Sequence, residues 1–85
     1  MIMETVEIRE KLNSIFQDVF DDESIQINDT TNAESIEDWD SLMHINLIVA
    51  TEKEFEVKFA LGETQKLQNV GEMIVLINKK MNENE

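Results

Sequence analysis

The sequence contains no cysteine and no proline, and these absences restrict its chemistry before any motif is considered. Without cysteine there can be no disulfide framework, no thiol catalysis and no zinc site built on cysteine ligands. Without proline the chain has no stiff linker, and no segment approaches the roughly 18 apolar residues that a membrane-spanning helix needs. The 85 residues therefore predict one domain, 1–85, with a modest core and no membrane span.

Basic residues are scarce, with 7 lysines and arginines against 19 aspartates and glutamates and a net charge of -12. A chain this acidic excludes nucleic acid as a partner, because a phosphate backbone needs a basic footprint. It favours proteins with basic docking surfaces, which its electric field attracts. The first residues lack the basic region and the long apolar run of a signal peptide, so we expect a cytoplasmic protein.

Hydrophobic residues make up 41% of the chain and recur three and four positions apart, which indicates helices rather than disorder. We expect three main helices at about 4–20, 41–55 and 70–81, and one short helix at about 63–67. A long loop, 21–40, separates the first two helices. The pattern therefore predicts an all-α fold, a small bundle around one core.

Individual residues mark the ends of these segments. Leu61 and Gly62 indicate a turn before the short helix. Asn69 is suited to cap the last helix, with Glu72 placed three residues later as in a capping box. In the long loop we expect three apolar anchors that hold it across the bundle: Ile25, Ile27 and Ile36. A short strand over 25–27 is an alternative, although it would find no partner strand.

The centre of the chain is Asp40-Ser41-Leu42, where an acidic run meets an apolar helical segment. Ser41 falls on the first turn of that helix, with Asp38 or Asp40 available as its N-cap. The free N–H groups and the positive dipole end of a helix favour a negatively charged group, including a phosphate ester. The serine hydroxyl is therefore expected to be exposed and suited to carry a phosphodiester.

A helical wheel of 41–55 separates two apolar stripes. The stripe expected to face the core consists of Met43, Leu47, Ala50, Thr51 and Phe55. The second stripe lies on the side of Ser41 and consists of Leu42, Ile45 and Val49, joined by Glu52. A helix of a small bundle needs only one stripe to face its core. The second stripe is therefore either buried between several helices or a docking surface beside Ser41.

The residues around Ser41 closely resemble the acyl carrier protein family: Asp40-Ser41-Leu42, then Ile45, 47–50 and 52–55. In that family the serine of this motif holds a 4′-phosphopantetheine arm, which a separate phosphopantetheinyl transferase attaches from coenzyme A. The resemblance implies a carrier with no catalytic activity of its own. Its arm on Ser41 would bear an acyl group as a thioester and present it to partner enzymes.

The resemblance also implies roles for the neighbours of the serine. Asp40 would be read by the transferase. The positions expected to meet acyl-loading and acyl-using enzymes, whose docking surfaces are basic, are Asp38, Leu42, Ile45, Val49 and Glu52. The wheel independently places four of these positions beside Ser41, which favours the docking explanation of the second stripe. A monomer is expected.

The chain departs from the family at five positions near the motif. The family often has glycine at the first of them, a small residue at the second, and acidic or small polar residues at the other three. This chain has instead Asp38, Trp39, Met43, His44 and Asn46. The start of the docking helix is therefore less negative than in the fatty-acid carriers. This favours a secondary carrier dedicated to one pathway, such as a polyketide, a modified surface sugar or another specialised acyl product, over the housekeeping fatty-acid role. Asp40 argues against an aminoacyl cargo.

Other functions remain as alternatives. His44 lies one turn after Ser41, and with Asp38 or Asp40 it suggests a Ser-His-Asp hydrolase, but no glycine elbow or oxyanion hole is evident. We expect His44 to be a surface or rim residue, and one histidine is a poor basis for a transition-metal site. Trp39 is expected to pack the loop onto the bundle, or else to contact the arm or a partner. The main alternative is an acidic helical adaptor that binds proteins without any modification.

Overall fold

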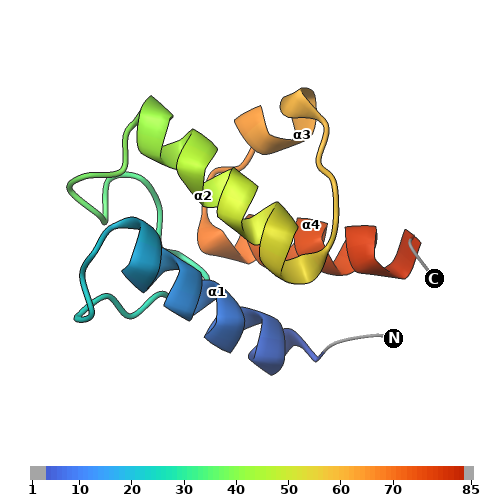
Figure 1. Ribbon diagram of the computed structural model, residues 1–85, viewed down its shortest axis with the longest axis horizontal. Helices are drawn as coiled ribbons and strands as arrows, with labels where there is room; N and C mark the ends of the chain where they lie inside the picture. The colour runs from blue at the N-terminus through green and yellow to red at the C-terminus, as the bar shows by residue number, and fades with distance from the viewer. Residues whose placement is uncertain (1–3, 84–85) are drawn as a thin grey trace.

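The computed structural model describes residues 4–83, and within them the chain forms four helices and no strand (Figure 1). The helices are α1 (Thr5–Val19), α2 (Ser41–Phe55), α3 (Leu61–Gln65) and α4 (Val70–Glu83). The predicted all-α fold of three main helices and one short helix, with a long loop after the first, is confirmed. The ends of the predicted domain, 1–3 and 84–85, lie outside the described residues.

The first helix is at the centre of the packing, because α1 contacts both α2 and α4. Each long helix contributes one buried stripe at the predicted spacing. The buried residues of these three stripes are Ile8, Leu12, Ile15 and Phe16 from α1, Leu47, Thr51 and Phe55 from α2, and Val70, Met73, Ile74 and Ile77 from α4. Full burial of such apolar side chains is worth about 1.5–3 kcal/mol each. None of the helices in residues 4–83 is long and apolar enough to cross a membrane.

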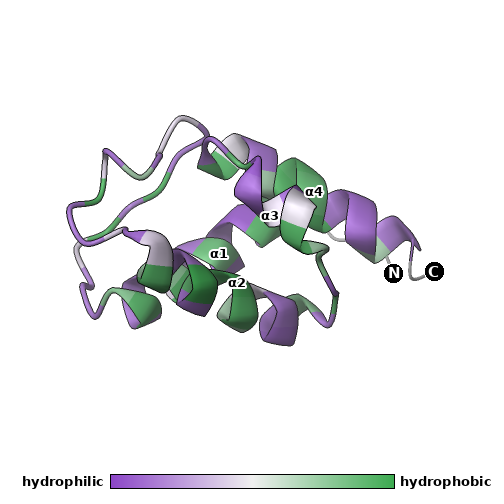
Figure 2. Cartoon of the chain, turned by 90° about the horizontal axis from the view of Figure 1, so that it is seen from above, coloured by the Kyte–Doolittle hydropathy of each residue, from purple (hydrophilic) through white to green (hydrophobic). Residues whose placement is uncertain are grey.

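The long loop is mostly hydrophilic with isolated hydrophobic residues (Figure 2). Ile27 is buried in the core, and Ile25 and Ile36 are partly buried against it, so the three predicted anchors are present. Residues 25–27 form no strand. The Asn13 side chain on α1 instead accepts the Ile27 N–H at 2.8 Å, which satisfies the extended backbone there.

The same loop closes the start of α4. The Thr31 carbonyl accepts the Val70 N–H at 2.8 Å, and the Asp29 carbonyl accepts the Gly71 N–H at 2.9 Å. The first N–H groups of a helix have no partner inside it, and here the loop supplies carbonyl acceptors for two of these N–H groups. A Cβ at Gly71 would lie 3.0 Å from the Asp29 oxygen, so glycine permits this close approach. An ion pair between Arg9 and Asp29, 2.7 Å long, holds the loop to α1 as well.

Two local predictions are wrong in detail. The short helix begins at Leu61 rather than at 63, so Leu61 and Gly62 belong to its first turn. The reason is that the Glu63 carboxylate accepts the Ala60 N–H at 2.8 Å, which stabilises a helix start immediately after Ala60. At the start of α4, Asn69 accepts the Glu72 N–H at 2.9 Å as predicted. The return bond of the capping box is replaced, because Glu72 accepts the N–H of Gln68.

Candidate functional site

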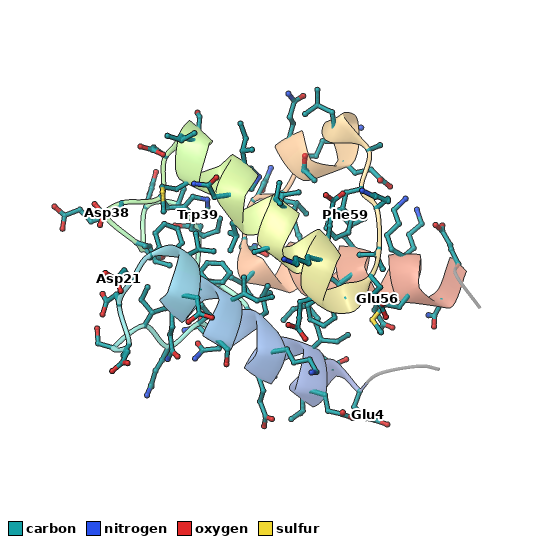
Figure 3. The ribbon with its side chains drawn as sticks, viewed as in Figure 1. Glu4, Asp21, Asp38, Trp39, Glu56 and Phe59 are labelled. Atoms are coloured by element: carbon teal, nitrogen blue, oxygen red, sulfur yellow. The ribbon has the colours of Figure 1, made fainter. Side chains whose placement is uncertain are left out.

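Ser41 is the first residue of α2, and it is exposed. Asp40 is the N-cap, and its carboxylate accepts the Met43 N–H at 2.9 Å. Asp38, the other candidate cap, lies exposed in the preceding loop (Figure 3). The structure therefore places an exposed hydroxyl at the positive end of a 15-residue helix, where a phosphate ester is electrostatically favoured.

The second apolar stripe of α2 lies on the surface. Leu42, Ile45 and Val49 are 65%, 58% and 57% exposed. Leu47 on the opposite side is fully buried. Burial between several helices is therefore the wrong explanation for Leu42, Ile45 and Val49, which we call the exposed stripe. Together with Ser41 it forms a mainly apolar surface that another protein could cover.

Glu52, the acidic neighbour of this stripe, is half-buried and has a structural role. One of its carboxylate oxygens accepts the Phe59 N–H at 2.8 Å, which fixes the connection between α2 and α3. Figure 3 labels Glu56 at the start of that connection and Phe59 near its other end. The sequence places Glu52 beside the stripe correctly but gives no sign of its bond to Phe59.

Trp39 packs the loop onto the bundle, as predicted, at the point where the end of α1 meets the start of α2 (Figure 3). Its ring meets the Phe16 ring edge-on with centroids 5.2 Å apart, and it lies 6.2 Å from the Phe20 ring. Such aromatic pairs contribute about 0.5–1.5 kcal/mol beyond the area that they bury. These ring contacts therefore fix the backbone immediately before the Asp40 cap.

His44 is more than the surface or rim residue that the sequence predicts. It is half-buried, and its Nδ1 and Nε2 lie 3.1 Å from Trp39 Nε1 and 3.2 Å from the Thr64 carbonyl oxygen. The indole N–H can only donate, so Nδ1 is the acceptor and the ring proton lies on Nε2, which donates to Thr64. Both nitrogens are therefore engaged away from Ser41. This arrangement provides no base for the serine of a hydrolase.

A cavity of about 700 Å³ lies beside Ser41, between α2, α3 and the start of α4. Its walls are mostly apolar and include Trp39, Ile45, Ile48, Val49, Phe59, Leu61, Leu67 and Met73. Pockets of this size and lining suit small apolar groups. The sequence did not identify the contributions of Phe59, Leu61 and Thr64, because the segment after α2 has no regular period. The apolar Phe59 and Leu61 within a polar stretch are the only signal for them.

The third helix is tied to α4 by an ion pair between Glu63 and Lys80, 2.9 Å long. The pKa of Glu63 is lowered, mainly by the Ala60 N–H that its carboxylate accepts and then by the hydrogen bond to Lys80. The pKa of Lys80 is raised, mainly by its hydrogen bond to Glu63. Neither residue lines the cavity beside Ser41. Within residues 4–83 no cluster of three or more acidic or histidine side chains could hold a metal ion.

Comparisons with known proteins identify relatives of the whole chain. The chain is 36% identical over 74 residues to a curated protein named acyl carrier protein from Akkermansia muciniphila, covering 85% of this chain and 90% of the relative. It also matches the solution NMR structure of a holo acyl carrier protein from Geobacter metallireducens. That match has a TM-score of 0.85 and 48% identity, over 91% of this chain and 88% of the other. No protein-family model matches the chain.

Proposed function

The chain belongs to the acyl carrier protein family, and we propose that Ser41 is the residue that holds its 4′-phosphopantetheine arm. Members of this family carry acyl groups and do not catalyse reactions on them. The observation that carries the proposal is the position of Ser41, which is exposed on the first turn of α2 behind the Asp40 cap. An acyl group on such an arm would be bound as a thioester and presented to acyl-handling enzymes.

The test of Ser41 is incubation with a broad-specificity phosphopantetheinyl transferase and coenzyme A, followed by intact mass measurement. We expect one phosphopantetheine to be added, and Ser41→Ala to abolish the addition without unfolding the protein. Ser14→Ala, an exposed serine on α1, is the matched control and should still be modified. Addition at another serine, or none with several transferases, would support the unmodified adaptor instead.

Asp40 has two roles in this proposal, which one substitution separates. As the N-cap it stabilises α2, and as an acid beside Ser41 it would be recognised by the transferase. Asp40→Asn keeps a side-chain oxygen that can cap Met43, and asparagine is as good a cap as aspartate. We therefore expect this variant to keep its stability but to be modified more slowly. Equal modification rates for Asp40→Asn and the unaltered chain would show that the transferase does not recognise the charge of Asp40.

We propose that the exposed stripe, with Asp38 and Glu52 at its edges, is the surface that meets the transferase and the acyl-handling enzymes. Support comes from the exposure of its three apolar side chains and from their position beside Ser41. The net charge of -12 favours enzymes with basic docking surfaces. One oxygen of Glu52 is bound to Phe59, so its other oxygen would face the partner. A monomeric state and a cytoplasmic location remain predictions from the family resemblance and the sequence.

We also propose that this carrier serves one specialised pathway rather than housekeeping fatty-acid synthesis. Support comes from the first turn of α2, which contains no acidic residue, and from Met43, His44 and Asn46 at positions where the family usually has acidic or small polar residues. The test is the intact mass of the protein from its native host, which shows the arm and its acyl group together. Ordinary long-chain fatty acyl groups on Ser41 would contradict this assignment.

A further inference from the structure

A chain of hydrogen bonds joins the loop, α2 and α3 through His44, which lies one helical turn after Ser41. The chain runs from the Trp39 indole N–H to His44 Nδ1, over 3.1 Å, and from His44 Nε2–H to the Thr64 carbonyl, over 3.2 Å. Both hydrogen bonds are made by a single imidazole ring, whose plane lies at 20° to that of the Trp39 ring. We call Trp39, His44 and Thr64 the latch.

The latch matters because α3 has little else to hold it. This helix has only five residues, of which Thr64 is the buried one and Leu61 is 72% exposed. Most contacts between helices join α1 to α2 and α1 to α4. Among the described residues, the polar contacts of α3 with other helices are the His44 bond on the side of α2 and the Glu63–Lys80 ion pair on the side of α4. Its distance from α2 therefore depends strongly on His44.

That distance also sets the size of the cavity beside Ser41. His44 forms part of its wall on α2, and Thr64 forms part of its wall on α3. Both nitrogens of His44 are already bonded, so the ring offers the cavity no free polar atom there. A group that fits the cavity of about 700 Å³ leaves the latch closed. A longer group must push α3 away from α2, which breaks the bond between His44 and Thr64.

We propose that the latch limits the length of the acyl group that this carrier can enclose, with His44 as the specificity-determining residue. The inference rests on the proposed function, because cargo reaches the cavity from an arm on Ser41. Opening the latch leaves the half-buried His44 Nε2–H without an acceptor, while the Thr64 carbonyl keeps only the longer bond of 3.4 Å from the Leu67 N–H. An unpaired buried donor is unfavourable. Acyl groups beyond the limit therefore stay outside in solvent.

The experiment compares the same protein loaded with acyl groups of increasing length. A promiscuous transferase would attach acyl-phosphopantetheine from acyl-coenzyme A thioesters, from acetyl through hexanoyl and dodecanoyl to hexadecanoyl, and intact mass would verify each product. An enclosed acyl group binds only the folded state and so raises Tm. For the unaltered chain we expect Tm to rise with acyl length up to a limit and then to stop rising.

Variants at His44 show whether the latch sets that limit. His44→Phe keeps a ring but removes both hydrogen bonds, and its Tm should continue to rise with longer acyl groups. His44→Gln has an amide oxygen for Trp39 and an amide N–H for Thr64, and it should restore the limit. Asn13→Ala, which removes the bond to Ile27 outside the cavity, is the stability control. It should lower Tm equally at every length and leave the limit unchanged.

The outcomes separate this inference from the function on which it rests. If no acyl arm can be attached at Ser41, both are overturned. If attachment is normal but Tm stops rising at the same acyl length in the unaltered chain and in His44→Phe, only the role of the latch is overturned. The same holds if the unaltered chain shows no limit up to hexadecanoyl.

Discussion

Truncation to alanine should destabilise the protein much more in the buried stripe of α2 than in its exposed stripe. Leu47 is fully buried, and replacing such a core leucine by alanine costs about 2–5 kcal/mol. At the usual 0.05–0.15 kcal/mol per residue, a domain of this length has only about 4–13 kcal/mol of unfolding free energy. Leu47→Ala should therefore remove a large share of the stability and could leave the protein substantially unfolded.

Ile45 should respond weakly because it is 58% exposed. Complete burial of an isoleucine is worth about 1.5–3 kcal/mol, so its partial burial accounts for about 1 kcal/mol. Alanine also favours the helix by a few tenths of a kcal/mol relative to isoleucine, which offsets part of this loss. We expect Ile45→Ala to lower the unfolding free energy by less than about 1 kcal/mol. It should nevertheless slow arm attachment, because apolar residues central to a patch anchor protein partners.

Urea denaturation measures the first effect, with Trp39 fluorescence and helical circular dichroism as probes. The single tryptophan packs on Phe16 and should report loss of the core. The rate of modification at Ser41 measures the second effect. Large and equal losses of stability for Leu47→Ala and Ile45→Ala would place Ile45 in the core, and the exposed stripe would then be misassigned. An unchanged modification rate for Ile45→Ala would remove this residue from the docking surface.

Two further predictions concern α3 and α4. Gly62→Ala adds a Cβ that meets nothing within 4 Å and should stabilise the protein by up to about 1 kcal/mol, whereas Gly71→Ala brings a Cβ to 3.0 Å from the Asp29 oxygen and should give no gain. Equal gains in thermal melts would show that the loop is not pressed against α4. The pKa of Glu63 is lowered by the Ala60 N–H and then by Lys80, so its carboxylate stabilises the fold above the usual glutamate pKa. This contribution is lost as the pH falls through the lowered pKa. The deficit of Glu63→Gln in urea denaturation should therefore be largest near neutral pH and fade on acidification, and a deficit independent of pH would contradict this.

The sequence predicts the three long helices well because each has a buried stripe at helical spacing. It also places Ser41 at the start of a helix with its possible caps, since an acidic run directly before an apolar helix is a local signal. The choice of Asp40 over Asp38 needed the backbone, because the cap is defined by its bond to Met43. Whether Ile45 was buried or exposed also needed the structure. A helical wheel shows that two stripes exist, but it cannot show how many neighbours the helix has.

The contacts of His44 could not be predicted from the sequence. Thr64, one of its partners, lies on a helix too short to show a period, and Trp39 is held by aromatic rings on α1. The path of the loop was equally hidden, apart from its isoleucine anchors. Asn28 and Asn32 accept backbone N–H groups two residues ahead, and such local bonds shape a loop without leaving a regular pattern.

The loop carbonyls that close the start of α4 make two distant parts of the chain open together. If the loop leaves, the first N–H groups of Val70 and Gly71 lose their partners, and the Asp29 and Thr31 carbonyls lose theirs. Fraying of α4 from its first turn therefore also requires release of a segment from the first half of the chain. Partial opening should then involve both as one cooperative unit, and the amide hydrogens of Val70 and Gly71 should exchange with solvent only when that unit opens.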